Sequence, residues 1–392
     1  MTTPSPKPDH GRRIERWLVK WLPAGLLTMV AFACYLYAGA LTVPQSWKHD
    51  FLGFYTASSF ARHGTLDRLY DPAAIAQFQK TIAPENPYPI PFSRPRFYAL
   101  ILSPLSLLPY RTAFAAWISC LTALLLACWA WFAAKFGPDA LIMAAFFFPA
   151  GIGIAHGQDA VLLLALAIAS YAAFERKNQP LAGMLIGCML FKFHLILLLP
   201  VAMLIQRRWK MLQGFALVAA FLAAIELWIG GWQGIADYAH FLLRRDIPGL
   251  NPGEQMMVNI HSLLINLGMD TAGARLMFSL IAIVLIIVGM NTAEWWRAMA
   301  SAGLGSAALL PHTYQYDLTW TLVPLICIAF LSTDKLVRLS ILPLLTPLPY
   351  LLNLAGMPWS GATSLCLLLL LGTNAWVIRG ELAASMLQRR VA

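Results

Sequence analysis

Long apolar segments constrain the fold of this chain more than any other feature. Only 12% of the residues are charged and 59% are hydrophobic, whereas soluble domains carry about 25% charged residues. A chain this apolar cannot cover a water-facing surface, so its solvent must be lipid. We count about twelve segments that are candidates for membrane spans: 17–41, 111–134, 139–155, 160–175, 181–191, 195–206, 211–230, 273–291, 297–311, 317–331, 336–352 and 360–378.

The segments are rich in Leu, Ala and Ile, and no alternation with a period of two runs through them. This pattern predicts helices rather than the strands of a membrane barrel. We therefore expect an all-α polytopic membrane protein with about twelve transmembrane helices. The pair 181–191 and 195–206 is too short for two full spans, because a span needs about 20 residues, and it favours a tight re-entrant hairpin.

The distribution of basic residues predicts an orientation. With the N-terminus in the cytoplasm and alternating spans, most of the 28 Lys and Arg residues fall in short inner segments, as the positive-inside rule requires. The net charge of +10 is therefore explained without nucleic acid. We expect cytoplasmic tails at 1–16 and 381–392, a membrane domain at 17–380, and location in the plasma (inner) membrane. Ala38-Gly39-Ala40 resembles a signal-peptide cleavage site, but the apolar stretch is long for a signal peptide.

Two large segments are expected on the outer, extracytoplasmic side, at 42–110 and 231–272. In the first, residues 53–63 predict a short helix, and Asp71 before Pro72 predicts the N-cap of a second helix. The proline-rich stretch 84–91 excludes a helix or a central strand and predicts an extended strap. Residues 97–109 predict an interfacial or half-inserted helix.

Polar residues gather at the expected outer mouths of the spans, on one side of the membrane. Ionisable residues at membrane depth are costly and usually functional or paired. We therefore expect a polar cleft formed by His49-Asp50, His156-Gly157-Gln158-Asp159, Lys192-Phe193-His194, His261-Ser262 and 311–317, which includes His312, Tyr316 and Asp317.

The same residues could instead have purely structural roles. Asp50 and Asp159 could each cap the helix that follows. Lys192 could extend to the membrane surface, pair with a carboxylate, or bind an anion such as phosphate. The six cysteines all lie in expected spans, and we find no CxxC or His/Cys cluster. We expect neither a disulfide framework nor a metal or other cofactor.

Several short patterns occur in a characteristic order: Asp50-Phe51-x-x-Phe54-Tyr55, Gly64-x-x-x-x-Leu69-Tyr70-Asp71, Leu100-x-x-x-Pro104-Leu105-x-x-Leu108-Pro109, Gly157-Gln158-Asp159 and Phe191-Lys192. The series resembles glycosyltransferase family 87, of the GT-C superfamily, over roughly residues 45–330. The resemblance implies an enzyme that takes a sugar, mainly mannose, from a polyprenyl-phosphate carrier on the non-cytoplasmic side. It maps the acidic residue of the first outer loop onto Asp50. The sequence departs from the superfamily pattern at His156-Gly157-Gln158-Asp159 and at His194.

Sugar transfer has an oxocarbenium-like transition state and needs a base for the acceptor hydroxyl. We assign that role to Asp50, with inversion at the anomeric carbon. The leaving phosphate needs cations or donors. Candidates are Lys192 first, then His312 or His261, then Arg94 or Arg96. Further candidates for the polar pocket are His49, Tyr55, Gln158, Asp159, His194, Tyr316 and Asp317. The expected partners are the lipid-linked donor, a glycolipid or glycan acceptor, and membrane lipids.

The competing hypothesis is a transporter or flippase of lipid-linked sugars. Twelve spans with both termini inside suit many carriers. The sequence shows no pairing of its two halves, which many transporters have, and the large outer loop with a carboxylate at its start favours an enzyme.

Overall fold

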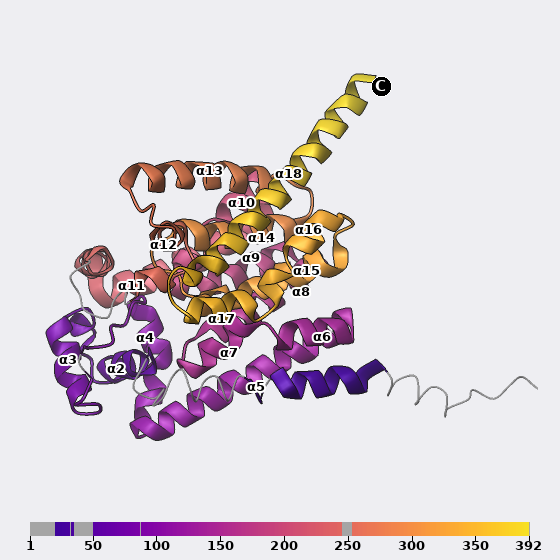
Figure 1. Ribbon diagram of the computed structural model, residues 1–392. Helices are drawn as coiled ribbons and strands as arrows, with labels where there is room; N and C mark the ends of the chain where they lie inside the picture. The colour runs from indigo at the N-terminus through magenta and orange to yellow at the C-terminus, as the bar shows by residue number, and fades with distance from the viewer. Residues whose placement is uncertain (1–19, 32, 35–49, 87, 245–252, 392) are drawn as a thin grey trace, which may run out of the picture.

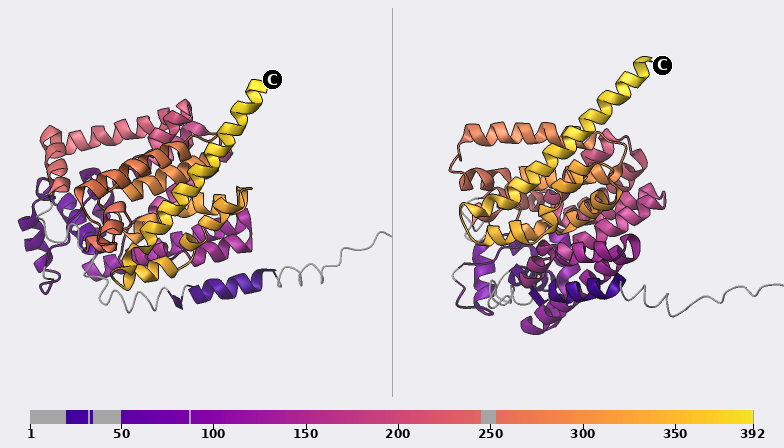
Figure 2. Two further views of the ribbon diagram at one scale, coloured as in Figure 1. Left: turned by 45° about the horizontal axis from the view of Figure 1, so that its top comes forward. Right: turned by 45° about the vertical axis from the view of Figure 1, so that its right-hand side comes forward.

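The computed structural model describes residues 20–31, 33–34, 50–86, 88–244 and 253–391. Helices account for all of the regular structure in these residues, without a strand among them (Figure 1). This confirms the expected all-α fold. The C-terminal helix α18 (Ala362–Val391) crosses the body and its last turns extend beyond it (Figure 2).

Five helical segments are long and apolar enough to cross a membrane, and their bounds are Tyr110–Phe136 (α5), Gln179–Ile196 (α9 and η4), Trp209–Leu243 (α11), Ala272–Met290 (α13) and Trp359–Ala384 (η8 and the first part of α18). A bent pair, α6 (Pro138–Ala145) and α7 (Phe148–Ala155), makes a sixth if it counts as one span. The structure therefore confirms a multi-helix membrane protein, but it does not confirm twelve spans.

The expected span 17–41 lies partly outside the described residues. The remaining expected spans, between residues 160 and 352, form helices that are shorter than the roughly 20 residues that a bilayer requires. They break at prolines, at polar residues and at short turns of 3₁₀ helix. Their bounds are Ala160–Glu175 (α8), Leu199–Ile205 (α10), Trp295–Leu309 (α14), Gln315–Thr321 (η6), Leu322–Leu331 (α15), Lys335–Ser340 (α16), Pro343–Leu345 (η7) and Leu348–Leu354 (α17).

The outer surfaces of the long helices carry exposed apolar stripes. On α13, Leu276, Leu280 and Val284 follow one another at intervals of four residues and are all exposed. Residues four apart lie on the same face of a helix, so they form one continuous apolar strip. Exposed apolar surface on this scale indicates contact with lipid.

Small residues set the path of the chain between α9 (Gln179–Gly187) and α11. Gly183 lies directly against the backbone of Met211, and Gly187 lies against Val218, so α9 and α11 run side by side in the same direction. The chain between them must therefore go in and return. It is kinked at Lys192, stays helical to Ile196, turns at 197–198 and comes back through α10. The first arm of the predicted re-entrant hairpin is therefore longer than expected, since Gln179–Ile196 is long enough to cross a membrane.

The first outer segment contains α2 (Asp50–Arg62), η2 (Leu66–Arg68), α3 (Pro72–Lys80), α4 (Arg96–Leu102) and η3 (Ser103–Leu107). Asp71 caps α3, because its side chain accepts from the backbone N–H of Ala73 at 2.9 Å. The strap between α3 and α4 is not helical, as its prolines predict. Gln79 holds it in place, donating to the Ile90 carbonyl at 2.8 Å and accepting from the Ile90 N–H at 2.7 Å.

The second outer segment, predicted at 231–272, begins at a break in α11. The predicted span 211–230 ends where α11 breaks, at Gly231 with a φ of +58°, and a second helical stretch then runs on to Leu243. Glycine adopts this conformation without steric cost. The short helices η5 (Glu254–Met256) and α12 (Ile260–Asn266) follow. Residues 245–252 are outside the described part of the chain.

Candidate active site

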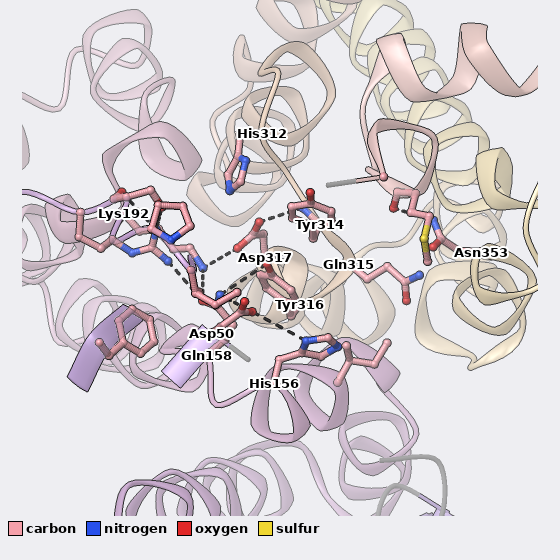
Figure 3. Close-up of a pocket in the computed structure, with 18 of the residues that line it drawn as sticks. Asp50, His156, Gln158, Lys192, His312, Tyr314, Gln315, Tyr316, Asp317 and Asn353 are labelled. Carbon is pink, nitrogen blue, oxygen red and sulfur yellow. Dashed lines mark hydrogen bonds and ion pairs between the residues drawn. The ribbon is translucent and has the colours of Figure 1, made fainter. Parts of the chain in front are cut away.

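A cavity of about 550 Å³ brings together segments that are far apart in the sequence (Figure 3). Its volume is within the range typical of small-ligand sites. The wall is built by the start of α2, the strap, the turn between α7 and α8, the break at Lys192, the chain from His312 to Asp317, and the end of α17. Of the predicted pocket residues, those that line it are Asp50, Arg94, Gln158, Lys192, His312, Tyr316 and Asp317.

Asp50 is the first residue of α2, where the helix dipole favours a carboxylate. Its side chain is 28% exposed, so it is open to the cavity. Its Oδ2 accepts a hydrogen bond from Gln158 Nε2 at 2.8 Å and lies 3.8 Å from His156 Nδ1. Asp50 is therefore an accessible carboxylate, and one of its oxygens, Oδ2, is fixed by a hydrogen bond from Gln158.

The turn that carries Gln158 is pressed against α2. Gly157 has a φ of +72°, and a Cβ there would lie 2.9 Å from Cβ of Phe51, so the turn requires glycine. Trp117 Nε1 donates to the Gly157 carbonyl at 2.8 Å. This packing fixes the distance between the turn and Asp50.

Four buried charged residues form a cluster beside the cavity, which we call the ion cluster: Arg94, Asp159, Lys192 and Asp317. Arg94 Nε lies 3.2 Å from Asp159 Oδ2. Lys192 Nζ lies 3.3 Å from Asp159 Oδ1 and 2.5 Å from Asp317 Oδ1. Each of the four side chains is at most 4% exposed. Two positive and two negative charges cancel, so the cluster is neutral as a whole.

The ion cluster keeps Asp159 ionised in spite of its burial. Burial raises the pKa of this carboxyl group, but the charges and hydrogen bonds of Arg94 and Lys192 outweigh that effect and lower the pKa to about 2. An isolated buried carboxylate would behave in the opposite way. Asp159 therefore serves as the common counterion of both cations.

Lys192 takes its place because the helical segment breaks at this residue, where φ is −127° and ψ is 51°. Its ammonium lies 5.2 Å from the centroid of the Tyr316 ring, which adds a cation–π contact. Among the open roles for this lysine, the structure shows pairing with carboxylates. Lys192 still lines the cavity, although only 1% of its side chain is exposed.

Aromatic rings lie next to the ion cluster and line the cavity. Tyr314 and Tyr316 stack with centroids 5.6 Å apart, and the His312 ring lies 5.3 Å from Tyr314. Burial lowers the pKa of His312 to about 4, against the raising effect of Asp317. At neutral pH His312 is therefore an uncharged hydrogen-bonding group and supplies no positive charge.

Several predicted site residues lie away from the cavity. His261 Nε2 contacts Asp270 at 3.3 Å. Tyr55 donates its hydroxyl to the Leu108 carbonyl at 2.9 Å. Asp159 lies behind the wall in the ion cluster, and His194 is next to His312, with ring centroids 6.0 Å apart. His49 is outside the described residues.

Arg96 also lies away from the cavity, where it fastens the strap to α11. Its guanidinium contacts Glu226 at 3.7 Å and donates to the Gly234 carbonyl. The Glu226 carboxylate in turn accepts from the backbone N–H groups of Arg96 and Phe97. Arg96 therefore has its partners in the fold rather than in the pocket.

Some lining residues are absent from the residues assigned individually to the pocket: His156, Ser93, Tyr314, Gln315 and Asn353. His156, Tyr314 and Gln315 belong to polar motifs that the sequence did single out. Asn353 follows an expected span, and its polarity is the only signal that the sequence offers. In the part of the chain that the structure describes, no group of three His, Cys, Asp or Glu side chains could hold a metal ion.

The ends of the helices that are remote from the cavity carry basic residues. α8 begins at the cavity beside Asp159 and ends at Glu175, which pairs with Lys135 at 2.7 Å. Near the start of α14, Arg208 donates to the Ala293 carbonyl at 3.1 Å, and Arg297 pairs with Glu381 at 2.8 Å. The cavity and this basic end are therefore at opposite ends of the helices.

Comparison with known families identifies the class of the protein. A sequence model of glycosyltransferase family 87 matches residues 92–313, which is more than half of the chain. The chain belongs to glycosyltransferase family 87. This confirms the resemblance found in the sequence. No curated protein and no solved structure matches the chain significantly.

The part that matches family 87 carries much of the cavity wall. It includes Arg94, Gln158, Lys192 and His312, whereas Asp50 lies outside it. A glycosyltransferase requires a sugar donor and an acceptor, and the apolar helices place this one in a membrane. The role of Asp50 therefore depends on its geometry and not on the family match.

Proposed function

We propose that this membrane glycosyltransferase transfers a hexose, mannose in the first instance, from a polyprenyl-phosphate carrier to a glycolipid or glycan. The observation that carries the proposal is the half-buried carboxylate of Asp50 in a cavity large enough for a sugar. The exposed apolar faces of the long helices suit a donor whose lipid chain stays in the bilayer.

In the proposed reaction, the acceptor hydroxyl gives its proton to Asp50 as its oxygen attacks the anomeric carbon. The bond from that carbon to the phosphate oxygen breaks, and the phosphate keeps the bonding electrons. Retaining enzymes usually need a second carboxylate as nucleophile. The other two carboxylates at the site, Asp159 and Asp317, are buried in ion pairs, so we propose a single displacement with inversion.

The leaving phosphate needs hydrogen-bond donors or positive charge as its own charge grows. Lys192 is the cation that we propose for this role, because it lies at the cavity wall and contributes three N–H donors. His312 adds a neutral ring N–H. Arg94, which shares the counterion Asp159 with Lys192, adds a second positive charge at the cavity wall. Arg96 and His261 are left out of the proposed donor site, because Glu226 and Asp270 occupy them.

The orientation of the protein is also proposed. Basic residues gather at the end of the helices remote from the cavity, and basic loops favour the cytoplasmic side. We therefore propose that the cavity faces the extracytoplasmic side of the plasma (inner) membrane, with both termini in the cytoplasm. Labelling of a cysteine introduced at Asn86, on the cavity wall, with a membrane-impermeant reagent in intact cells tests this proposal. Exclusive labelling from the cytoplasmic side would contradict it.

The test of the function is an assay on purified protein in detergent, without any ion gradient. The protein is mixed with radiolabelled polyprenyl-phosphate mannose and a glycolipid acceptor. We expect free polyprenyl phosphate and a mannosylated product. If the donor stays intact under these conditions but crosses the bilayer of reconstituted vesicles, the protein is a transporter and the proposal is wrong.

A further inference from the structure

The side chain of Gln158 joins Asp50 to the ion cluster (Figure 3). Its Nε2 donates to Asp50 Oδ2 at 2.8 Å. Its Oε1 accepts from Arg94 Nη2 at 3.3 Å and from Lys192 Nζ at 3.4 Å. The amide can have only this orientation, because the reverse would place N–H groups against two cations and an oxygen against a carboxylate.

The backbone of Gln158 is fixed as firmly as its side chain. Its N–H donates to the Gly153 carbonyl at 2.8 Å, and the preceding Gly157 is packed on Phe51, the residue that follows Asp50. The residue as a whole is 7% exposed. A rigid path therefore runs from the two cations through one amide group to the carboxylate.

We propose that Gln158 is a positioning residue for sugar transfer, which holds Oδ2 of Asp50 so that the other carboxylate oxygen meets the acceptor hydroxyl. The inference rests on the proposed function. The two cations polarise the amide through its oxygen, and hydrogen bonds in such a chain strengthen one another. The donor to Asp50 is thereby strong and constant in direction, which the proton transfer requires.

Removing the hydrogen bonds of Gln158, which bridge Asp50 and the ion cluster, should specifically lower turnover. A displacement of a reacting group by 1 Å can cost about 100-fold in rate. Asp50 would still be present, and the ion cluster would keep its direct ion pairs, so donor binding should change little. We therefore expect the loss in kcat and not in the KM for the donor.

Two substitutions of nearly the same shape separate the two ends of the bridge. Gln158→Met removes both the donor and the acceptor, whereas Gln158→Glu keeps acceptor oxygens for Arg94 and Lys192 but removes the donor to Asp50. We expect kcat to fall by about 10- to 100-fold in the Met variant and further in the Glu variant, since a second carboxylate then lies beside Asp50. Higher activity in the Glu variant than in the Met variant would overturn the proposal, because it would show that Gln158 serves the ion cluster alone.

The matched control is Gln206→Met, at the basic end of the molecule. Gln206 has the same chemistry, since its Nε2 donates to the Thr292 carbonyl at 2.7 Å and its Oε1 accepts from Arg208 Nε at 2.5 Å. It is far from the cavity, so its kcat should stay at the wild-type level. If Gln158→Met does not fold, the Glu variant carries the test, and wild-type turnover in it overturns the inference.

Failure of this inference can be distinguished from failure of the proposed function. If Asp50→Asn still transfers sugar, Asp50 is not the base, and the proposed mechanism fails together with the role of Gln158. If Asp50→Asn is inactive while Gln158→Met has normal kcat, only the positioning role is wrong.

Discussion

Substitution of Lys192 by Met tests whether the ion cluster is a neutral unit in which each charge needs its partner. The change keeps the length of the side chain but removes its charge. Asp159 would keep Arg94 at 3.2 Å, whereas Asp317 would lose the ammonium at 2.5 Å and stay 1% exposed. Removing one partner of a buried ion pair costs about 3–5 kcal/mol, because the other charge is left uncompensated.

Neutralising Asp317 as well should recover most of that loss. In Lys192→Met with Asp317→Asn, the cluster is neutral again. The amide oxygen introduced by the second substitution can still accept the backbone N–H of Tyr314, which now donates to Asp317 Oδ2 at 2.8 Å. The remaining cost should be on the order of 1 kcal/mol, the net value of a typical hydrogen bond. Unfolding by SDS in mixed micelles, followed by tryptophan fluorescence, measures these differences in free energy.

Lys135→Met is the matched control for this experiment. The Lys135–Glu175 pair is nearly as short as the Lys192–Asp317 pair, at 2.7 Å, but its side chains are 38% and 35% exposed. Pairs with this exposure contribute about 0–1 kcal/mol. The reasoning is refuted if Lys192→Met costs no more than Lys135→Met, or if the double variant is no more stable than Lys192→Met alone.

Two further predictions concern stability. His312 has a pKa of about 4 in the folded protein and about 6.5 when unfolded. As the pH falls, the unfolded state therefore binds the proton before the folded state does. The folded protein loses stability between about pH 6.5 and about pH 4, by up to about 3 kcal/mol. Urea or SDS unfolding at a series of pH values should show this slope, and the slope should lessen in His312→Gln; an unchanged slope would contradict the assignment. Gly183→Ala should cost about 1–3 kcal/mol or more, because the new methyl group meets the Met211 backbone, whereas Gly273→Ala, with open space around it, should be neutral. Equal stability of the two alanine variants would contradict the close packing of α9 on α11.

The sequence was sufficient for features that depend on neighbouring residues. The Asp71-Pro72 pair marks the start of α3 because both the capping oxygen and the fixed φ of proline act within one turn. The prolines of 84–91 exclude a helix for an equally local reason. Apolar composition likewise located the long apolar helices, but it could not decide whether a short one crosses the membrane, because that depends on its neighbours.

The arrangement of the site depends on contacts between distant residues, which no local pattern encodes. Lys192 lies 33 residues from Asp159 in the sequence, and three roles were open for it until the structure placed two carboxylates beside it. Arg94 and Arg96 look equivalent in the sequence, yet one joins the ion cluster and the other fastens the strap to α11. Which partner each arginine meets is decided by segments more than 60 residues further along the chain.

The most direct test of the account is the transfer rate of Asp50→Asn with polyprenyl-phosphate mannose as the donor. The amide has the same shape as the carboxylate but cannot take the acceptor proton. The account predicts normal folding and donor binding together with loss of transfer, while Asp67→Asn, which changes an exposed carboxylate in the same outer segment, keeps wild-type turnover. Near-normal transfer by Asp50→Asn would contradict the claim that Asp50 is the base.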